Sequence, residues 1–324
     1  MTLNPRIAFA GTTSNAARTL EALVAGNFEI GAVITREDSP VGRKQVLTPS
    51  PVAQVAERHG LPLIKANRIG TGELELLAGL DCNLGVVVAY GALLKSNALQ
   101  ALDLGWFNLH YSLLPQWRGA SPVQAALAAG QHETGVTLFR LDEGMDTGPI
   151  IGQLETLINP HENAGELLAR LTELGITLLS EQLPMLLSGM SSAREQVGEA
   201  TYCGKLARAE ARLDFDQPAQ RIESAIRAFN PEPGAWTTIF DEPIKVLDAR
   251  ALGATDWAAL SESSSGTSQP TQPTGRVSVE KNRVLVHCGA GTLLELREVQ
   301  PAGKKPMIAN DWARGLAGRE VLFK

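Results

Sequence analysis

Three polar side chains of the kinds that bind and move protons lie in two short stretches of the chain. Asn108 and His110 are two residues apart at the end of an apolar run, and Asp146 lies within the stretch 142–148. Side chains on a strand alternate between its faces, so a strand over 106–110 places Asn108 and His110 on the same face. An Asp that reaches an imidazole orients it, as in other enzymes. The three groups together predict a catalytic imidazole beside an amide.

The segments around these residues are typical of a doubly wound, mostly parallel α/β sheet. Apolar runs predict strands at 6–10, 29–35, 61–65, 84–91, 106–110, 134–141 and 149–157, alternating with helices expected at 16–25, 50–59, 71–80, 121–130 and 163–189. We expect Ser14 or Asn15 to cap the first helix and Pro184 to interrupt the last one. The turn Leu-Leu-Pro ends the 106–110 strand at once, so its polar pair lies near a carboxyl end, where ligands bind in such sheets.

One connection is unusually long. The stretch 36–49 contains Pro, Gly and the pair Arg43-Lys44. Connections in this kind of fold normally take only a few residues, so the sequence predicts a loop that is either functional or disordered.

Composition indicates a globular chain of two domains. The 324 residues are 44% hydrophobic and 20% charged. No apolar run approaches the roughly 18 residues of a membrane span, and the first residues lack the order of a signal peptide, so we expect a cytoplasmic protein. Three scattered cysteines, Cys82, Cys203 and Cys288, have no zinc spacing and are expected to be buried small hydrophobic residues, with no metal site.

Charge is unevenly distributed along the chain. The net charge of −6 argues against a protein coated with nucleic acid, yet residues 281–324 carry eight Lys and Arg against four Asp and Glu. This excess hints at a polyanionic substrate held from one side, although ordinary surface scatter explains it nearly as well.

The second part of the chain has a different character. Short alternating segments from about residue 193 onward, separated by Gly, Pro and Asp turns, predict a small β-barrel. The polar stretch 261–274 is expected to be a disordered loop between strands. We therefore expect a catalytic domain at 1–190, a linker at 191–207 and the barrel domain at 208–324.

The stretch from Asn108 to Pro122, together with Asp142 to Gly148, resembles the signature of the folate-dependent formyltransferases. The resemblance implies a Rossmann-like formyltransferase fold, 10-formyltetrahydrofolate as co-substrate, no metal, and a catalytic trio of Asn108, His110 and Asp146. It also implies a set of folate-binding residues, which are Val88, Ala89, Tyr90, Gly91, Ser112, Leu113, Leu114, Pro115 and Asp142. The first turn departs from the pattern, with Thr13 and Ala16 where the family usually has Pro and an aromatic residue.

Within the family, the chain is most similar to members that formylate the methionyl group of initiator tRNA. Asp38, Pro40, Gly42 and Arg43 match their tRNA-gripping loop, although Gln45 and Val46 replace common lysines, and the stretches 227–231 and 300–305 match their OB-like carboxyl-terminal barrel. The resemblance implies initiator methionyl-tRNA as partner, a monomer, and a set of tRNA contacts at Arg43, Lys44, Lys205, Lys304 and Lys305.

The implied reaction assigns one task to each member of the trio. Asn108 would stabilise the developing oxyanion, and Asp146 would fix the tautomer of His110 and raise its pKa. His110 would either take the proton of the amine or, as imidazolium, assist the oxyanion. The alternatives are a formyltransferase for glycinamide ribonucleotide or an amino sugar nucleotide, and a non-catalytic RNA-binding protein. A nicotinamide-dependent dehydrogenase is weaker because the glycine fingerprint is missing.

Overall fold

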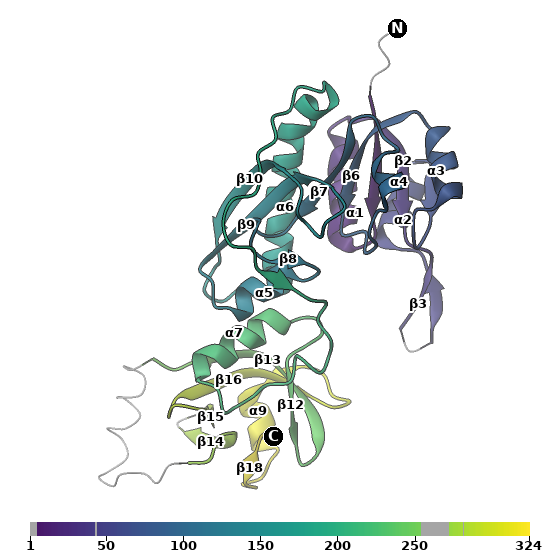
Figure 1. Ribbon diagram of the computed structural model, residues 1–324. Coiled ribbons are helices and arrows are strands. Elements are labelled where there is room, and N and C mark those ends of the chain that lie inside the picture. The colour runs from purple at the N-terminus through teal and green to yellow at the C-terminus, as the bar shows by residue number, and fades with distance from the viewer. Residues whose placement is uncertain (1–4, 43, 254–271, 281) are drawn as a thin grey trace. The chain divides into compact units, whose positions relative to one another are not determined.

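The structure is a computed structural model that describes residues 5–42, 44–253, 272–280 and 282–324. Its described residues fall into two compact units (Figure 1). The first unit comprises the chain up to Pro122 with Glu133–Leu157 and Leu168–Cys203, and the second comprises Val123–His132, Ile158–Leu167 and Gly204–Lys324. Each unit has its own sheet.

The first unit is built on a seven-stranded sheet in the order β10-β9-β7-β6-β1-β2-β5. β1, β2, β5, β6 and β7 pair in parallel, whereas β9 and β10 are antiparallel. The strands are β1 (Arg6–Gly11), β2 (Ile30–Thr35), β5 (Leu63–Lys65), β6 (Cys82–Val88), β7 (Gly105–His110), β9 (Glu133–Arg140) and β10 (Ile150–Leu157). This is the doubly wound, mostly parallel sheet that the sequence predicted.

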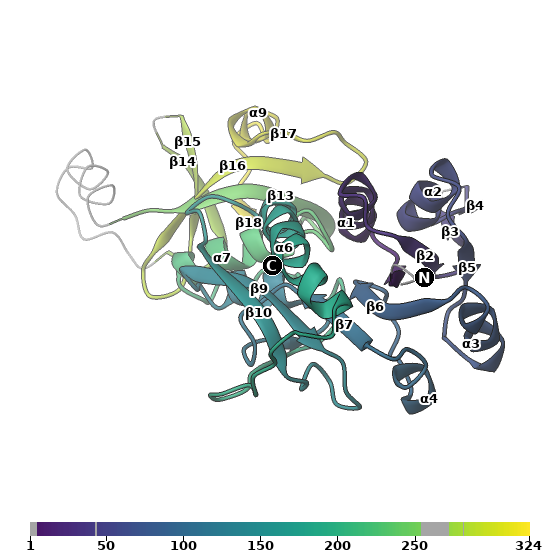
Figure 2. The same cartoon turned by 90° about the horizontal axis from the view of Figure 1, so that it is seen from above.

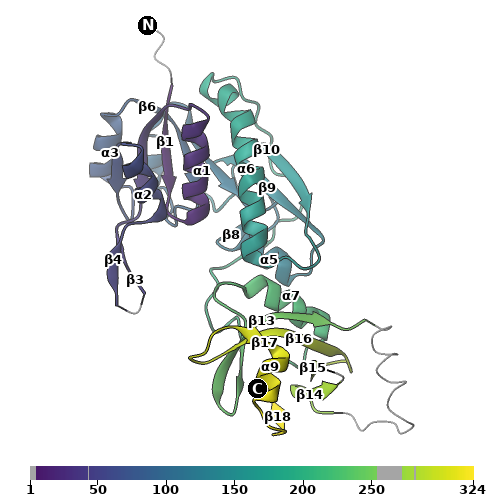
Figure 3. The same ribbon diagram turned by 180° about the vertical axis from the view of Figure 1, so that it is seen from behind.

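Helices cover both faces of this sheet (Figure 2). One face carries α1 (Ser14–Ala25), α2 (Pro51–Arg58) and the later turns of α6 (Ala164–Leu187), which Figure 3 shows from behind; the other carries α3 (Thr71–Ala78) and α4 (Ser96–Leu99). The approach of α6 to β7 requires a glycine, because a Cβ at Gly175 would lie 2.6 Å from Leu109. Leu109 therefore faces α6, and the alternation of β7 turns Asn108 and His110 to the opposite face.

The order of strands reverses between β1 and β6. From β1 the chain builds outward through β2 and β5, and then returns to add β6 and β7 on the other side. In open α/β sheets, ligands bind at the carboxyl ends of the strands beside such a reversal. Val88 pairs with Gly11 there, and Val87 is the partner of Asn108. The register therefore brings the predicted folate segment 88–91 to the end of the strand that carries His110.

Three local expectations were wrong. The stretch 36–49 contains an antiparallel hairpin of β3 (Ser39–Val41) and β4 (Val46–Thr48). α1 is preceded by Thr13 as N-cap, without a side-chain capping bond, because Ser14 already belongs to the helix. Pro184 does not interrupt α6: the lost hydrogen bond falls within the last turn, where Leu183 and Leu186 are fully packed.

The second unit is a nearly closed, antiparallel, barrel-like sheet in the order β12-β13-β16-β15-β14-β18, with β17 paired to β16. Its elements are α5 (Pro122–Ala128), α7 (Ala219–Phe229), β12 (Trp236–Ile239), β13 (Glu242–Ala251), β14 (Arg276–Glu280), β15 (Arg283–His287), β16 (Leu293–Pro301), β17 (Met307–Ile308), α9 (Ala309–Arg314) and β18 (Val321–Leu322). α7 and α9 contribute Ile222, Ile226 and Trp312 to its apolar core. The small β-barrel that the sequence predicted in this part of the chain is confirmed.

Other predictions have mixed outcomes. Cys288 is buried as expected, but Cys82 and Cys203 are only half-buried; burial raises the pKa of Cys82 to about 11 and that of Cys288 to about 12. Most of the expected 261–274 loop and Arg43 lie outside the described residues. No helix within the described ranges is long and apolar enough to cross a membrane.

Candidate active site

The imidazole of His110 is held by a backbone carbonyl. Its Nε2 atom lies 2.9 Å from the carbonyl oxygen of Trp117. A carbonyl only accepts hydrogen bonds, so Nε2 carries the proton and Nδ1 holds the lone pair of the neutral ring. The tautomer is thus fixed by Trp117 and not, as expected from the sequence, by Asp146.

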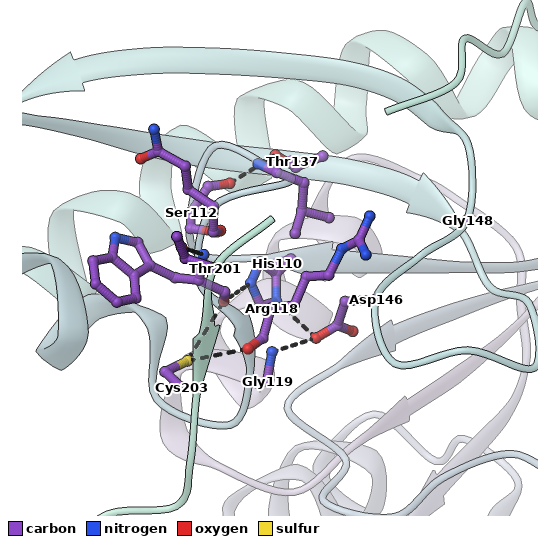
Figure 4. Close-up of polar contacts among 12 residues, drawn as sticks. His110, Ser112, Arg118, Gly119, Thr137, Asp146, Gly148, Thr201 and Cys203 are labelled. Atoms are coloured by element: carbon purple, nitrogen blue, oxygen red, sulfur yellow. Dashed lines mark hydrogen bonds and ion pairs between the residues drawn. The ribbon is translucent and has the colours of Figure 1, made fainter. Parts of the chain in front are cut away.

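Asp146 lies on the other side of the ring. Its Oδ2 atom is 3.8 Å from His110 Nδ1, too far for a hydrogen bond but close enough for an ion pair when the ring is protonated (Figure 4). The same oxygen accepts a hydrogen bond of 2.8 Å from the backbone N–H of Gly119. The carboxylate is therefore fixed by β8 (Arg118–Gly119) and faces the nitrogen that holds the lone pair.

Burial decides the protonation state of His110. The side chain is 5% exposed, and its removal from water lowers the pKa of the imidazole below the ordinary 6.5. The negative charge of Asp146 and the hydrogen bond to Trp117 raise the pKa, but by less than burial lowers it. The ring is therefore neutral at pH 7, and Asp146 limits the shift instead of producing a raised pKa.

The amide of Asn108 is available for a ligand. Asn108 is half-buried on the same face of β7 as His110 and stands between Val87 of β6 and Phe139 of β9. Within the described ranges, its side chain has no hydrogen-bond partner. A half-buried amide without a protein partner has two N–H donors free for a bound oxygen.

The predicted folate segment 88–91 forms a turn after β6. The Tyr90 carbonyl accepts from the Thr12 hydroxyl at 2.9 Å, and the Gly91 carbonyl accepts from Arg36 at 3.1 Å. Tyr90 itself is buried, with its hydroxyl donating to the Ala66 carbonyl. Ala89 is exposed and adopts a left-handed conformation with φ of 44°. The neighbouring carbonyls are thus engaged within the protein, and Ala89 presents its backbone to solvent.

The predicted folate segment Ser112–Pro115 is held by hydrogen bonds from side chains of β9 and β10. The Thr137 hydroxyl donates to the Ser112 carbonyl at 2.6 Å and accepts from the Leu114 N–H at 3.1 Å. Gln153 donates to the Leu114 carbonyl at 3.0 Å. Ser112 and Leu114 are buried, while Leu113 and Pro115 are half-buried. Leu113 and Pro115 are the two side chains of this segment that a ligand can reach.

The loop between β9 and β10 carries Asp142 as well as Asp146. Asp142 is exposed, and its Oδ1 atom accepts from the Gly144 N–H at 3.0 Å and from the Thr147 hydroxyl at 2.7 Å. Glu143 accepts a hydrogen bond of 2.6 Å from Ser96, which follows the folate segment of β6. The loop is therefore linked to the start of α4, which lies shortly after the predicted folate segment 88–91 in the chain.

The predicted tRNA contacts are all on the surface where the structure describes them. Lys44 lies in the exposed turn of the β3–β4 hairpin, and Lys205, Lys304 and Lys305 are exposed in the second unit. They are distributed over both units.

Several residues of the site were missed by sequence reasoning. Gln196 and Thr201 belong to the segment 191–207, which the sequence predicted to be a linker. They hydrogen-bond to the loops that carry Asp146 and Trp117. Asn15 donates to the Tyr111 hydroxyl at 2.9 Å, directly after His110. Nothing local in the sequence marks these residues, because each acts through a partner more than 40 positions away.

Comparison with known proteins identifies the family to which the chain belongs. A family model described as formyl transferase matches residues 5–183, and a second, described as formyl transferase, C-terminal domain, matches residues 205–317. The methionyl-tRNA formyltransferase of Leifsonia xyli subsp. xyli is 44% identical over 98% of this chain and 99% of its own length. That of Corynebacterium diphtheriae is 41% identical over 98% and 99%. The chain belongs to the methionyl-tRNA formyltransferases of the formyl transferase family.

Solved structures share the fold at lower identity. The N-formyltransferase from Helicobacter canadensis, solved with folinic acid and dTDP-3-aminofucose, aligns with a TM-score of 0.65 and 19% identity over 92% of this chain and 99% of that chain. HypX from Aquifex aeolicus, solved with tetrahydrofolic acid, aligns with a TM-score of 0.62 and 14% identity over 97% of this chain and 47% of that chain.

The family membership confirms the predicted enzyme class. Formyl transfer to a methionyl-tRNA matches the names of relatives over nearly the full chain, so the amino sugar alternative is not favoured. Within the described residues, no three His, Cys, Asp or Glu side chains are grouped to hold a metal ion.

Proposed function

We propose that the protein transfers the formyl group of 10-formyltetrahydrofolate to the α-amino group of methionyl-initiator tRNA, at a site formed by Asn108, His110 and Asp146. The proposal rests chiefly on one observation: a buried, neutral imidazole whose lone pair faces a carboxylate, on the same strand face as an amide without a protein partner. Membership of the methionyl-tRNA formyltransferases indicates which two substrates are used.

Each of the three side chains then has one task. Asn108 donates an N–H to the formyl oxygen as that oxygen gains negative charge. His110 takes the proton of the attacking amine at Nδ1, and Asp146 together with the Trp117 carbonyl stabilises the resulting imidazolium. His110 then returns the proton to the folate nitrogen as its bond to the formyl carbon breaks. The geometry therefore favours the base role of His110 over direct assistance to the oxyanion.

The residues present fit a folate co-substrate. When bound, 10-formyltetrahydrofolate supplies the formyl group and leaves as tetrahydrofolate. Its pterin ring carries amide-type donors and acceptors, which suit the exposed backbone of Ala89 and the Asp142 Oδ2 atom, for which the described residues provide no partner. We assign Ala89 and Asp142 as its polar contacts, with the half-buried Leu113 and Pro115 packing against it. Val88 is fully buried at the end of β6, so we assign it the role of supporting the turn from within the sheet. Tyr90, Gly91, Ser112 and Leu114 hold the two segments in shape.

The β3–β4 hairpin is suited to bind the acceptor stem of the tRNA. Val41, Val46 and Leu47 are 55%, 58% and 68% exposed, and Lys44 is exposed beside them. Apolar side chains at an exposed tip contact nucleotides, while a lysine contacts phosphate. We propose the same role for Arg43 from the sequence, and phosphate contacts for Lys205, Lys304 and Lys305.

The domain roles follow from these assignments. We propose a catalytic domain at 1–190, a connecting segment at 191–207 and a tRNA-binding barrel at 208–324. A monomer in the cytoplasm, where initiator tRNA is charged and used, meets the needs of this reaction.

The proposed function is tested by competition between acceptors. Purified protein is given 10-formyltetrahydrofolate labelled in the formyl group, together with methionyl-initiator tRNA and an amino sugar nucleotide. We expect the label on the methionyl ester alone. Label on the sugar, or on neither acceptor while tRNA is bound, would contradict the assignment and point to the sugar enzyme or to the RNA-binding protein, respectively.

A further inference from the structure

A polar segment that follows α6 in the sequence lies against both partners of His110. This segment, Arg194–Cys203, is called the strap here. It begins with a backbone bridge between Arg194 and Ile150, at bond lengths of 2.7 and 2.9 Å, and ends with β11 (Tyr202–Cys203), which pairs in parallel with β8. The strap thus runs from the start of β10 to the turn that follows His110.

Gln196 holds the loop that carries Asp146. Its side-chain amide donates two hydrogen bonds of 2.8 Å, to the backbone carbonyls of Asp146 and Gly148. Its carbonyl oxygen accepts from the Arg118 guanidinium at 2.7 and 3.2 Å. One glutamine thus uses both ends of its side chain to join the Asp146 loop to β8, whose Gly119 N–H binds the Asp146 carboxylate.

The end of the strap holds the carbonyl that binds His110. The Thr201 hydroxyl accepts from the Trp117 N–H at 2.8 Å, and the Thr201 carbonyl accepts from the Arg118 N–H at 2.9 Å. The Cys203 thiol lies 3.5 Å from the Trp117 carbonyl oxygen, the same oxygen that accepts from His110. The backbone of Trp117 is therefore held at its N–H by Thr201 and at its carbonyl by Cys203.

The two partners of His110 need this support because their backbones are strained. Trp117 and Asp146 both adopt left-handed conformations, with φ of 59° and 53°. Such conformations cost an L residue on the order of 1–3 kcal/mol and persist only where the surroundings enforce them. The local chain does not favour these positions by itself, and the hydrogen bonds of the strap supply the constraint.

We propose that the strap is the positioning device of the active site, in which Gln196 and Thr201 act as positioning residues that keep Asp146 and the Trp117 carbonyl against the His110 ring. The proposal rests on the proposed role of His110 in formyl transfer. It assigns to a segment expected to be a linker the task of maintaining the proton-accepting geometry, without contact to either substrate.

The test uses Gln196→Met in the full chain, because methionine has a similar length, adds no charge and removes all four hydrogen bonds of the glutamine. We expect kcat for methionyl-tRNA formylation to fall about 10- to 100-fold, with KM for tRNA and folate changed less than about threefold. Val197→Ala is the control, because Val197 is the adjacent strap residue and is 85% exposed.

The second readout is the NMR titration of the His110 ring, which a general loss of stability would not move. The charged or titratable groups drawn around the ring are Asp146, Arg118 and Cys203 (Figure 4). The charge of Asp146 raises the pKa of His110. We therefore expect that pKa to fall in Gln196→Met, as it does in Asp146→Asn, and to stay unchanged in Val197→Ala.

Two results would overturn the proposal: kcat and the His110 titration both unchanged in Gln196→Met, or kcat reduced in a folded variant whose His110 titration is that of the wild type. If Gln196→Met does not fold, Thr201→Val decides, since it removes only the hydroxyl that holds the Trp117 N–H. It is expected to lower both kcat and the His110 pKa. A wild-type protein that fails to formylate methionyl-tRNA would contradict the proposed function, while the titrations would still test the strap.

Discussion

The end of β7 and the β3–β4 hairpin, which follows β2, both lie at the carboxyl ends of interior strands of one sheet, yet they are built in opposite ways. His110 is buried and meets Trp117 and Asp146, which are themselves fixed by further hydrogen bonds. The hairpin exposes Leu47 and its apolar neighbours to solvent. In the first region, contacts within the protein fix the positions of a few atoms. In the second region, the side chains remain exposed and can contact a partner.

This difference separates chemistry from recognition. A proton transfer needs groups placed to within a fraction of an ångström, which only a packed and hydrogen-bonded surrounding provides. A nucleic acid surface is bound by exposed side chains that adapt to it, and contacts with the nucleic acid offset the cost of ordering them. Substitutions at the end of β7 should therefore change kcat, whereas substitutions in the hairpin should change KM for tRNA.

The largest effect is expected for His110→Ala. Loss of the base should lower kcat for formylation by about 10²- to 10⁴-fold while the Kd for tRNA stays near that of the wild type. Single-turnover assays and filter binding measure the two quantities, and His59→Ala, at an exposed histidine, serves as control. Wild-type turnover in His110→Ala would remove the mechanism.

The next effect compares two glycines with positive φ, one in each region. A Cβ at Gly119 would lie 2.1 Å from the Cys203 carbonyl oxygen, whereas a Cβ at Gly42 would meet nothing within 4 Å. Gly119→Ala should lower the free energy of unfolding by about 3 kcal/mol or more, and Gly42→Ala by about 1 kcal/mol. Urea denaturation measures both. Equal losses would show that the two regions are equally adaptable.

A smaller effect is expected for Lys44→Ala. Loss of one phosphate contact should raise KM for tRNA about threefold to tenfold, less at high salt because salt screens the contact in the wild type, and leave KM for folate and kcat unchanged. Arg58→Ala, which removes an exposed cation of α2 that pairs with Glu21 of α1, is the matched control. An equal rise in both KM values would argue against a tRNA contact in the hairpin.

The smallest effect concerns stability against pH. Burial holds the pKa of His110 below 6.5, so the unfolded chain binds a proton more readily than the folded one. The contribution of this group is complete above pH 6.5 and is lost as the pH falls toward the lowered pKa. The wild type should therefore lose stability relative to His110→Gln between pH 7.5 and 5.5, measured by urea denaturation. A relative gain would mean that the ring is charged in the fold.

Patterns close together in the sequence predicted the framework well. The alternation around Asn108 and His110 gave their common face, and the run of apolar residues in β6 gave its central position, because both signals arise within one strand. The hairpin was missed because each of its strands has only three residues and is mostly exposed, which is too short for an alternating apolar pattern.

Such patterns could not predict the residues that hold the site in place through hydrogen bonds. Trp117 binds Thr201 across 84 positions, and Gln196 binds Asp146 across 50. Polar residues in an irregular segment have no period that marks them, and their partners are backbone groups present in every residue. The sequence therefore indicated the groups that we propose to react, but not which groups hold them or that Trp117, not Asp146, fixes the tautomer of His110.

The protonation of the His110 ring tests this account most directly. Nitrogen-15 NMR of the wild-type protein at pH 7 distinguishes the two ring nitrogens. We predict a neutral ring with the proton on Nε2 and the lone pair on Nδ1, which gains a proton only below pH 6.5. A proton on Nδ1, or a ring already charged at pH 7, would contradict the proposed transfer of the amine proton to this histidine.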